Sequence, residues 1–171
     1  SGFGHIAFYP GVTIDSGTGR IALWAKALSN SNTFSQGIDF LDYDQGGEIV
    51  ITSHATTADA ITMYSDSSGS THSSSRGITS YWHGIYDNTN GWQGVQILAT
   101  AAGGGVNITG IGSSTAGSTD GWGVELEFID ILAKSGPITI TGVSGKTSAS
   151  GGFSVGWRAN ASSLARLGAW A

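Results

Sequence analysis

Short runs of alternating apolar and polar residues recur along the chain, separated by glycine-rich turns. The clearest covers residues 138–141, where two isoleucines alternate with two threonines between flanking glycines. Such alternation predicts a strand with one apolar face and one hydroxyl-bearing face. Similar runs cover residues 12–14, 20–27, 38–44, 48–52, 95–98, 106–109 and 124–131. The pattern therefore predicts an all-β protein built from short strands.

Copies of this run recur at a regular spacing. One series places an apolar residue at Leu23, Ile51, Ile78, Ile108 and Ile140, at intervals of roughly 30 residues. A second series, out of phase with the first, starts at positions 37, 60, 94, 123 and 152. Self-similarity at a period of roughly 20–50 residues is typical of solenoids. We therefore expect residues 1–171 to form a single parallel β-helix segment with coils of roughly 29 residues.

The composition fits strands joined by tight turns and excludes several functions. Glycine accounts for 28 of 171 residues and charged residues for 11%, and so much glycine weakens helices. The net charge of −5, with lysines and arginines scattered singly, argues against nucleic-acid binding. Cysteine is absent, so disulfides and thiolate metal sites are impossible. No apolar run approaches the ~20 residues of a membrane span, and we expect no cofactor, no nucleic-acid partner and no membrane insertion.

Three stretches carry specific expectations. Residues 65–75 are the most polar, and we expect a long surface loop within one coil. Residues 124–131 read as one strand with Glu125 and Glu127 on its solvated side. Leu164–Leu167 is the only candidate for a short helix. The chain does not begin with methionine and starts within the pattern, so we interpret it as a segment of a longer repeat protein or fibre.

Residues 133–142, Ala-Lys-Ser-Gly-Pro-Ile-Thr-Ile-Thr-Gly, are followed by a Gly/Ser loop and by Gly-Phe-Ser-Val, and Gly-Val-Glu-Leu begins at residue 123. This pattern resembles the repeats of filamentous-haemagglutinin-type exoproteins, large bacterial adhesins of the two-partner secretion class, over most of residues 12–158. The resemblance implies a right-handed parallel β-helix, export to the cell surface and an adhesive or fibre-forming role. The Asn-Pro motifs of the family's secretion domain have no counterpart in this sequence.

The densest acids lie between residues 39 and 48. Asp42 and Asp44 share one side of an expected strand, and Glu48 follows after a turn. Clustered carboxylates on one face of a β-helix bind Ca²⁺ or act as acid and base in sugar cleavage. These three residues are therefore the candidate calcium ligands, with solvated strand-end acids as the alternative. We predict no catalytic residue and no metal site.

Four residues are candidates for contacts with a ligand or partner. Trp92 and Trp122 each precede a Gly-Val strand, and their separation is close to one expected coil. Stacked on adjacent coils they would suit a sugar ring or a partner fibre; the alternative is that they fill corners of the core. Thr139 and Thr141 lie on the hydroxyl-bearing face. An ice-binding threonine array is an alternative for them, although the other coils offer only single threonines at the position that matches Thr141, namely Thr109, Thr79 and Thr52.

The two ends of the pattern stay apolar, at Ile6, Phe8 and Val12 and at Leu164, Leu167 and Trp170. A solenoid end exposes sheet edges unless a polar cap covers it, and no Lys-rich or Pro-rich guard stands at either end. We expect these residues to stack end to end with flanking coils or with other copies of the chain. The alternative is that residues 1–10 and 159–171 fold over the ends as caps.

The leading hypothesis is a non-catalytic structural repeat segment of a secreted bacterial adhesin or extracellular filament, located outside the cell or at its surface. The runner-up is a carbohydrate-active or carbohydrate-binding β-helix domain, with host or matrix glycans as partners. An acid pair beside a tryptophan in one groove would favour the second hypothesis. Acids dispersed along a smooth rod would favour the first.

Overall fold

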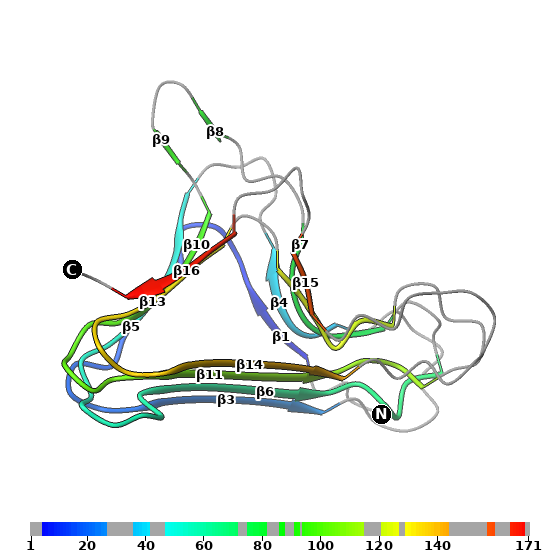
Figure 1. The fold of residues 1–171 in the computed structure, drawn as a ribbon. Coiled ribbons are helices and arrows are strands. Elements are labelled where there is room, and N and C mark those ends of the chain that lie inside the picture. Colours follow the sequence, from blue (N-terminus) through cyan, green and yellow to red (C-terminus); the bar gives the residue numbers. More distant parts are fainter. Residues whose placement is uncertain are drawn as a thin grey trace.

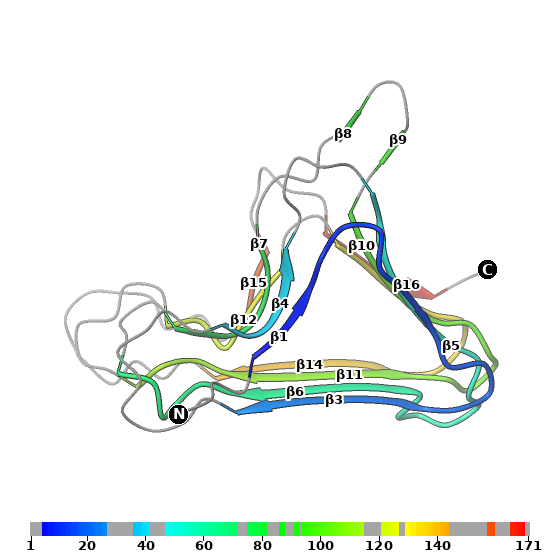
Figure 2. The same cartoon turned by 180° about the vertical axis from the view of Figure 1, so that it is seen from behind.

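The computed structural model describes residues 5–26, 36–41, 47–71, 75–81, 86–87, 91–92, 94–114, 121–126, 129–143, 157–159 and 165–169. These residues form strands and no helix, so none of them belongs to a helix that could cross a membrane. Three parallel sheets enclose a core of triangular cross-section (Figures 1 and 2). In Figure 1 the chain turns counterclockwise as it advances toward the viewer. The fold is the right-handed parallel β-helix that the sequence predicts.

Each of the first four coils gives one strand to each sheet, and β15 and β16 add a fifth strand to sheets A and B. Sheet A contains, in spatial order, β1 (Ile6–Phe8), β4 (Gln36–Leu41), β7 (Arg76–Tyr81), β12 (Val124–Leu126) and β15 (Trp157–Ala159). Sheet B contains β2 (Thr13–Asp15), β5 (Ile49–Ser53), β10 (Val95–Ala99), β13 (Ile129–Ala133) and β16 (Ala165–Ala169). Sheet C contains β3 (Ile21–Lys26), β6 (Ile61–Asp66), β11 (Val106–Ile111) and β14 (Ile138–Val143). An antiparallel pair, β8 (Tyr86–Asp87) and β9 (Gly91–Trp92), protrudes from the third coil before β10 (Figure 1).

The coils are longer than the sequence predicts. In sheet C the register aligns Leu23, Met63, Ile108 and Ile140, and every interval in this series exceeds the expected coil length. The expected series mixed sheets, because Ile51 belongs to sheet B and Ile78 to sheet A. Each coil holds three short strands that look alike in sequence, so the expected spacing often joins strands of different sheets. Only the step from Ile108 to Ile140 joined true neighbours.

Alternation along each strand directs aliphatic side chains into one shared core. Ladders of like residues result, such as Ile51–Ile97–Ile131 in sheet B, all fully buried. In sheet C such ladders leave the second face mainly to polar residues, which is how a parallel sheet avoids needing cover on both faces. Burying one such isoleucine contributes about 2 kcal/mol relative to leaving it exposed.

Glycines let sheets A and C meet closely at one corner. A Cβ atom added at Gly110 of β11 would lie 2.0 Å from the carbonyl oxygen of Gly123, and one added at Gly77 would lie 2.3 Å from the same oxygen. No side chain fits at such distances, so the backbones pack directly against each other. In the first coil, Ala25 occupies the register position of Gly110. The glycine content therefore serves close backbone packing as well as turns.

Two of the predicted elements are wrong. Residues 124–131 are not one strand, because the chain turns a corner between β12 in sheet A and β13 in sheet B. Glu125 is fully buried rather than solvated, and its Oε2 lies 3.1 Å from Nε of Arg76; Glu127 lies outside the described residues. Residues 165–167, expected to belong to a short helix, begin strand β16, because pairing with β13 outweighs a helical preference too short to stand alone.

The polar stretch 65–75 is also not a plain surface loop. Ser67, Ser70 and Ser75 are buried, and the hydroxyl oxygens of Ser70 and Ser75 are 2.7 Å apart. From the next coil, the Ser113 hydroxyl donates to the carbonyl of Ser70 at 2.9 Å. Serine is small enough to enter a tight corner and carries its own donor for a buried carbonyl. Serines here fill interior positions that the composition assigned to a loop.

Candidate functional site

The outer face of sheet C carries the most exposed large hydrophobic side chain among the described residues. Strand β3 alternates strictly, so Ile21 and Leu23 face the core while Trp24 and Lys26 face outward. Trp24 is 69% exposed. A tryptophan on the solvent side of a strand contributes little to the core, so the fold alone does not account for it.

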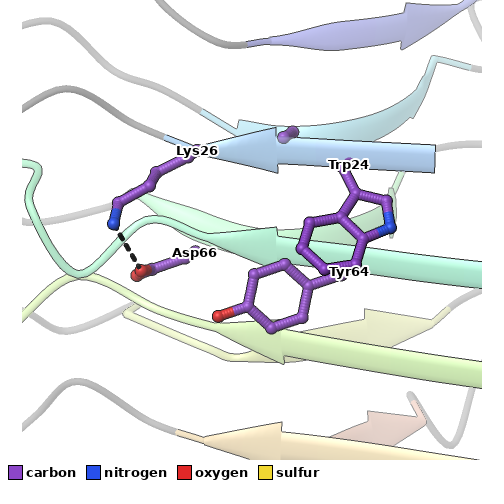
Figure 3. Close-up of a pocket in the computed structure, with 5 residues that line it drawn as sticks. Trp24, Lys26, Tyr64 and Asp66 are labelled. Atoms are coloured by element: carbon purple, nitrogen blue, oxygen red, sulfur yellow. Dashed lines mark ion pairs between the residues drawn. The ribbon is translucent and has the colours of Figure 1, made fainter.

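Register places an aromatic partner beside it. Strand β6 pairs with β3 so that Tyr64 lies next to Trp24 (Figure 3). Their ring centroids are 5.1 Å apart and the planes are tilted by 36°. The two rings come from adjacent coils of one rigid sheet, and together they form an aromatic platform, the name used below for Trp24 and Tyr64.

A charged pair lies beside the platform. Nζ of Lys26 is 3.7 Å from Oδ2 of Asp66, and both residues follow the aromatics by two positions on the same face (Figure 3). Partial burial raises the pKa of Asp66, but hydrogen bonds from Ser68 and the Lys26 ammonium outweigh it, so the pKa lies below its usual value. The carboxylate is thus ionised at neutral pH and balances the lysine charge.

A shallow hollow of about 450 Å³ joins these groups, lined by Trp24, Ala25, Lys26, Tyr64 and Asp66. Beyond it, the outer face continues with hydroxyl and amide side chains. The column of Trp24 and Tyr64 extends to Thr109 and Thr141, and the neighbouring column consists of Ala22, Thr62, Asn107 and Thr139. The face offers two rings for stacking and many groups for hydrogen bonding.

Thr139 and Thr141 lie where the sequence predicts. Both are exposed on β14, while Ile138 and Ile140 pack against the core. Their role as contact residues stays a prediction. An extended threonine array is absent from the described residues, because Thr79 and Thr52, expected to match Thr141, lie in sheets A and B.

Trp92 and Trp122 occupy different parts of their coils. Trp92 ends the β8–β9 hairpin before a strand of sheet B, whereas Trp122 precedes β12 of sheet A. Their spacing in the sequence therefore does not place them at equivalent positions of adjacent coils. The backbone carbonyl of Trp122 accepts a hydrogen bond from the amide of Gly77 at 3.0 Å, so this residue helps to close the glycine corner.

The candidate calcium ligands are not gathered in the part of the chain that the structure describes. Asp42 and Asp44 lie outside the described residues, and Glu48 is exposed before β5. The described residues contain no group of three or more His, Asp or Glu that could hold a metal ion. Their standing as candidate calcium ligands therefore rests on the sequence alone.

The sequence places Asp39 in the acidic segment but does not predict that this residue is buried. Asp39 of β4 is 2% exposed, and its burial raises its pKa to about 7 against the opposing effect of the Arg76 guanidinium. Nε2 of His5 lies 4.0 Å from its Oδ2, and burial lowers the pKa of this histidine. The alternation gives Asp39 an outward position, which normally means a solvated acid, so no sequence signal marks it.

The aromatic platform was also missed, although a signal exists. Trp24 and Tyr64 are the fourth residues of two strands that share the same alternation. Aligning β3 directly with β6 would have paired the rings, but the expected series aligned Leu23 with Ile51 instead. The right coil length was needed to see the site.

Comparisons with known proteins found no relative of this chain. No family model matches the chain, and no match was found among curated proteins or among solved structures.

Proposed function

We propose that the chain is a structural β-solenoid segment of a secreted bacterial adhesin or extracellular filament, located outside the cell or at its surface, and that it works without catalysis. The observation that carries the proposal is the state of the two ends. At both ends, residues that face the core are only partly buried, and the edge strands of the sheets have no partner strand on one side among the described residues. Such ends favour continuation by more coils of the same kind.

At the first coil, the apolar residues that face the core are incompletely covered. Ile6, Val12, Ile14 and Leu23 are only partly buried, and Phe8 stacks on Phe40 of the next coil at 5.1 Å. Strands β1, β2 and β3 each pair on one side only within the described part of the chain. A preceding coil could pair with all three strands and bury these side chains.

At the other end, Ile138 and Ile140 of β14 are also only partly buried. Strands β14, β15 and β16 each have one partner among the described residues. Leu167 lies in β16, while Leu164 and Trp170 lie outside the described residues. The two ends are complementary, because parallel strands continue a sheet only when the last coil of one unit meets the first coil of the next.

Sedimentation velocity at rising micromolar concentration tests this proposal. We expect the chain to form larger species, and Ile140→Asp or Leu23→Asp to prevent them, because either change places a charge in the junction. Each junction needs one end of each kind, so one substitution is enough. Val143→Asp is the matched control, since Val143 is exposed on the same strand as Ile140 but points away from the core.

A wild-type chain that stays monomeric at every concentration would contradict the proposal. So would association that Ile140→Asp and Val143→Asp reduce equally, because the junction would then lie on the face rather than at the end. Circular dichroism of each variant verifies that its strands are retained.

A further inference from the structure

A solenoid segment does not require an aromatic platform on its outer surface. The segment role explains the core and the two ends, but it leaves Trp24 exposed and stacked against Tyr64. Large apolar groups held at the surface by a rigid scaffold commonly mark a binding site. The neighbouring hydroxyl, amide and charged groups indicate what such a site would bind.

We propose that the outer face of sheet C, centred on Trp24 and Tyr64, binds a neutral polysaccharide. A pyranose ring has a face of C–H groups, which stacks on an aromatic ring, and a rim of hydroxyls, which needs hydrogen-bond partners. The platform supplies two adjacent aromatic rings on which the C–H face of a sugar can stack. Lys26 supplies a hydrogen-bond donor and Asp66 an acceptor for the sugar hydroxyls.

The geometry fits a chain of sugars better than a single sugar. The two rings come from adjacent coils and extend along the stacking direction. The same column continues to Thr109 and Thr141, and Thr62 and Asn107 lie beside it. An extended glycan lying along the sheet would stack on the rings at one end and meet hydroxyl and amide groups beyond them. The site is open and shallow, as a long polymer requires.

Charge selects a neutral ligand. The chain carries a net charge of −5, which repels an acidic polymer. At the platform itself, the Lys26 ammonium lies 3.7 Å from the Asp66 carboxylate, and the two charges balance. The pair therefore gives no net attraction for a uronate or sulfate group. A neutral, stiff glycan such as a β-linked glucan or chitin presents flat apolar ring faces without a charge.

The two aromatic side chains of the proposed binding surface can be removed without changing the core. Trp24 is mostly exposed, so Trp24→Ala removes half of the platform while leaving the core untouched. Tyr64→Ala removes the other half. Val143→Ala is the matched control, because Val143 is exposed on the same face, two strands away from Tyr64.

Isothermal titration of the full chain with cellohexaose, chitohexaose and a polygalacturonate oligomer tests the proposal. We expect binding of at least one neutral oligosaccharide in the micromolar to millimolar range. Trp24→Ala and Tyr64→Ala should each weaken it about tenfold, the effect of losing one stacking contact. Lys26→Met should weaken it less, and Val143→Ala should leave it unchanged.

Three results would overturn the proposal. One is the absence of binding to both neutral oligosaccharides at millimolar concentration. Another is wild-type affinity in Trp24→Ala. The third is binding of the acidic oligomer alone. Because the titration does not depend on association of the chain, any of these results leaves the proposed segment role standing, and failure of end-to-end stacking leaves the glycan site standing.

Discussion

The inner and the outer coils of this solenoid are built from the same alternation but are covered differently. In sheet C, Met63 and Ile108 on the inner strands are 0% and 1% exposed, whereas Leu23 and Ile140 at the same register position on the edge strands β3 and β14 are only partly buried. An identical inward position thus has a different energetic value, depending on whether a coil lies on both sides of it.

The largest expected difference comes from deleting a core side chain. Ile108→Ala should lower the free energy of unfolding by about 4 kcal/mol, since it leaves a cavity in a fully enclosed site. Ile140→Ala should cost about 2 kcal/mol, because its side chain is already partly hydrated in the isolated unit. Denaturant unfolding at low protein concentration measures both values. Equal losses would contradict the distinction between inner and outer coils.

The glycine corner gives the next effect. Gly110→Ala should destabilise the protein by about 3 kcal/mol, because the new Cβ would lie 2.0 Å from the Gly123 carbonyl oxygen and the backbones would have to separate. Gly17→Asn is the control: Gly17 has a φ of 56° and open space around it, and asparagine tolerates this conformation. Thermal unfolding that ranks the two variants in the reverse order would sink the close-packing account.

Burial of Asp39 predicts that the stability of the protein depends on pH. The effect comes from an enclosed coil, since the first coil has Ala7 at the register position of Asp39. Its pKa rises from 3.8 to about 7 on folding, so between these values the folded state holds a proton that the unfolded state has lost. Stability should therefore fall as the pH rises from 4 to 7, by up to about 1.4 kcal/mol per pH unit, and level off above 7.

Asp39→Asn should remove this slope and make the protein more stable than the wild type at pH 8, because the amide carries no charge to desolvate. Urea unfolding at several pH values measures it. A wild-type stability that instead rises steadily from pH 4 to pH 7, with no change in Asp39→Asn, would mean that Asp39 ionises normally in the folded protein.

The sequence predicts the class of fold because its signal is local. Alternation such as that of Ile138 to Thr141 marks a strand wherever it occurs, and its repetition marks a solenoid. The assignment of strands to sheets is not local: the run 124–131 contains a corner, and Ile51 and Leu23 look equivalent but belong to different sheets. The site depends on that assignment, because Trp24 and Tyr64 meet only in the true register.

The burial of several polar side chains could not be predicted from the sequence either. Glu125 and Asp39 occupy outward positions in the alternation, yet both are buried. Serines 67, 70 and 75 read as a loop and instead fill a corner through hydrogen bonds to backbone and to each other. Segments distant in the sequence decide which outward-facing side chains are covered. The alternation of apolar and polar residues therefore cannot predict this burial.

The central claim, that the outer coils are open surfaces ready to continue the solenoid, is tested most directly by amide hydrogen exchange at the two edge strands. Ile21 donates its N–H to the second coil, so alternation directs the N–H of Trp24 away from it. The carbonyl of Val143 accepts from Gly112, so the N–H of Ile140 likewise points outward. Both amides should exchange fast in dilute protein and gain protection as the concentration rises, while the amide of Ile108 stays protected throughout. Protection of the Trp24 and Ile140 amides that is already complete in dilute monomer would show that the ends are capped, and would contradict the claim.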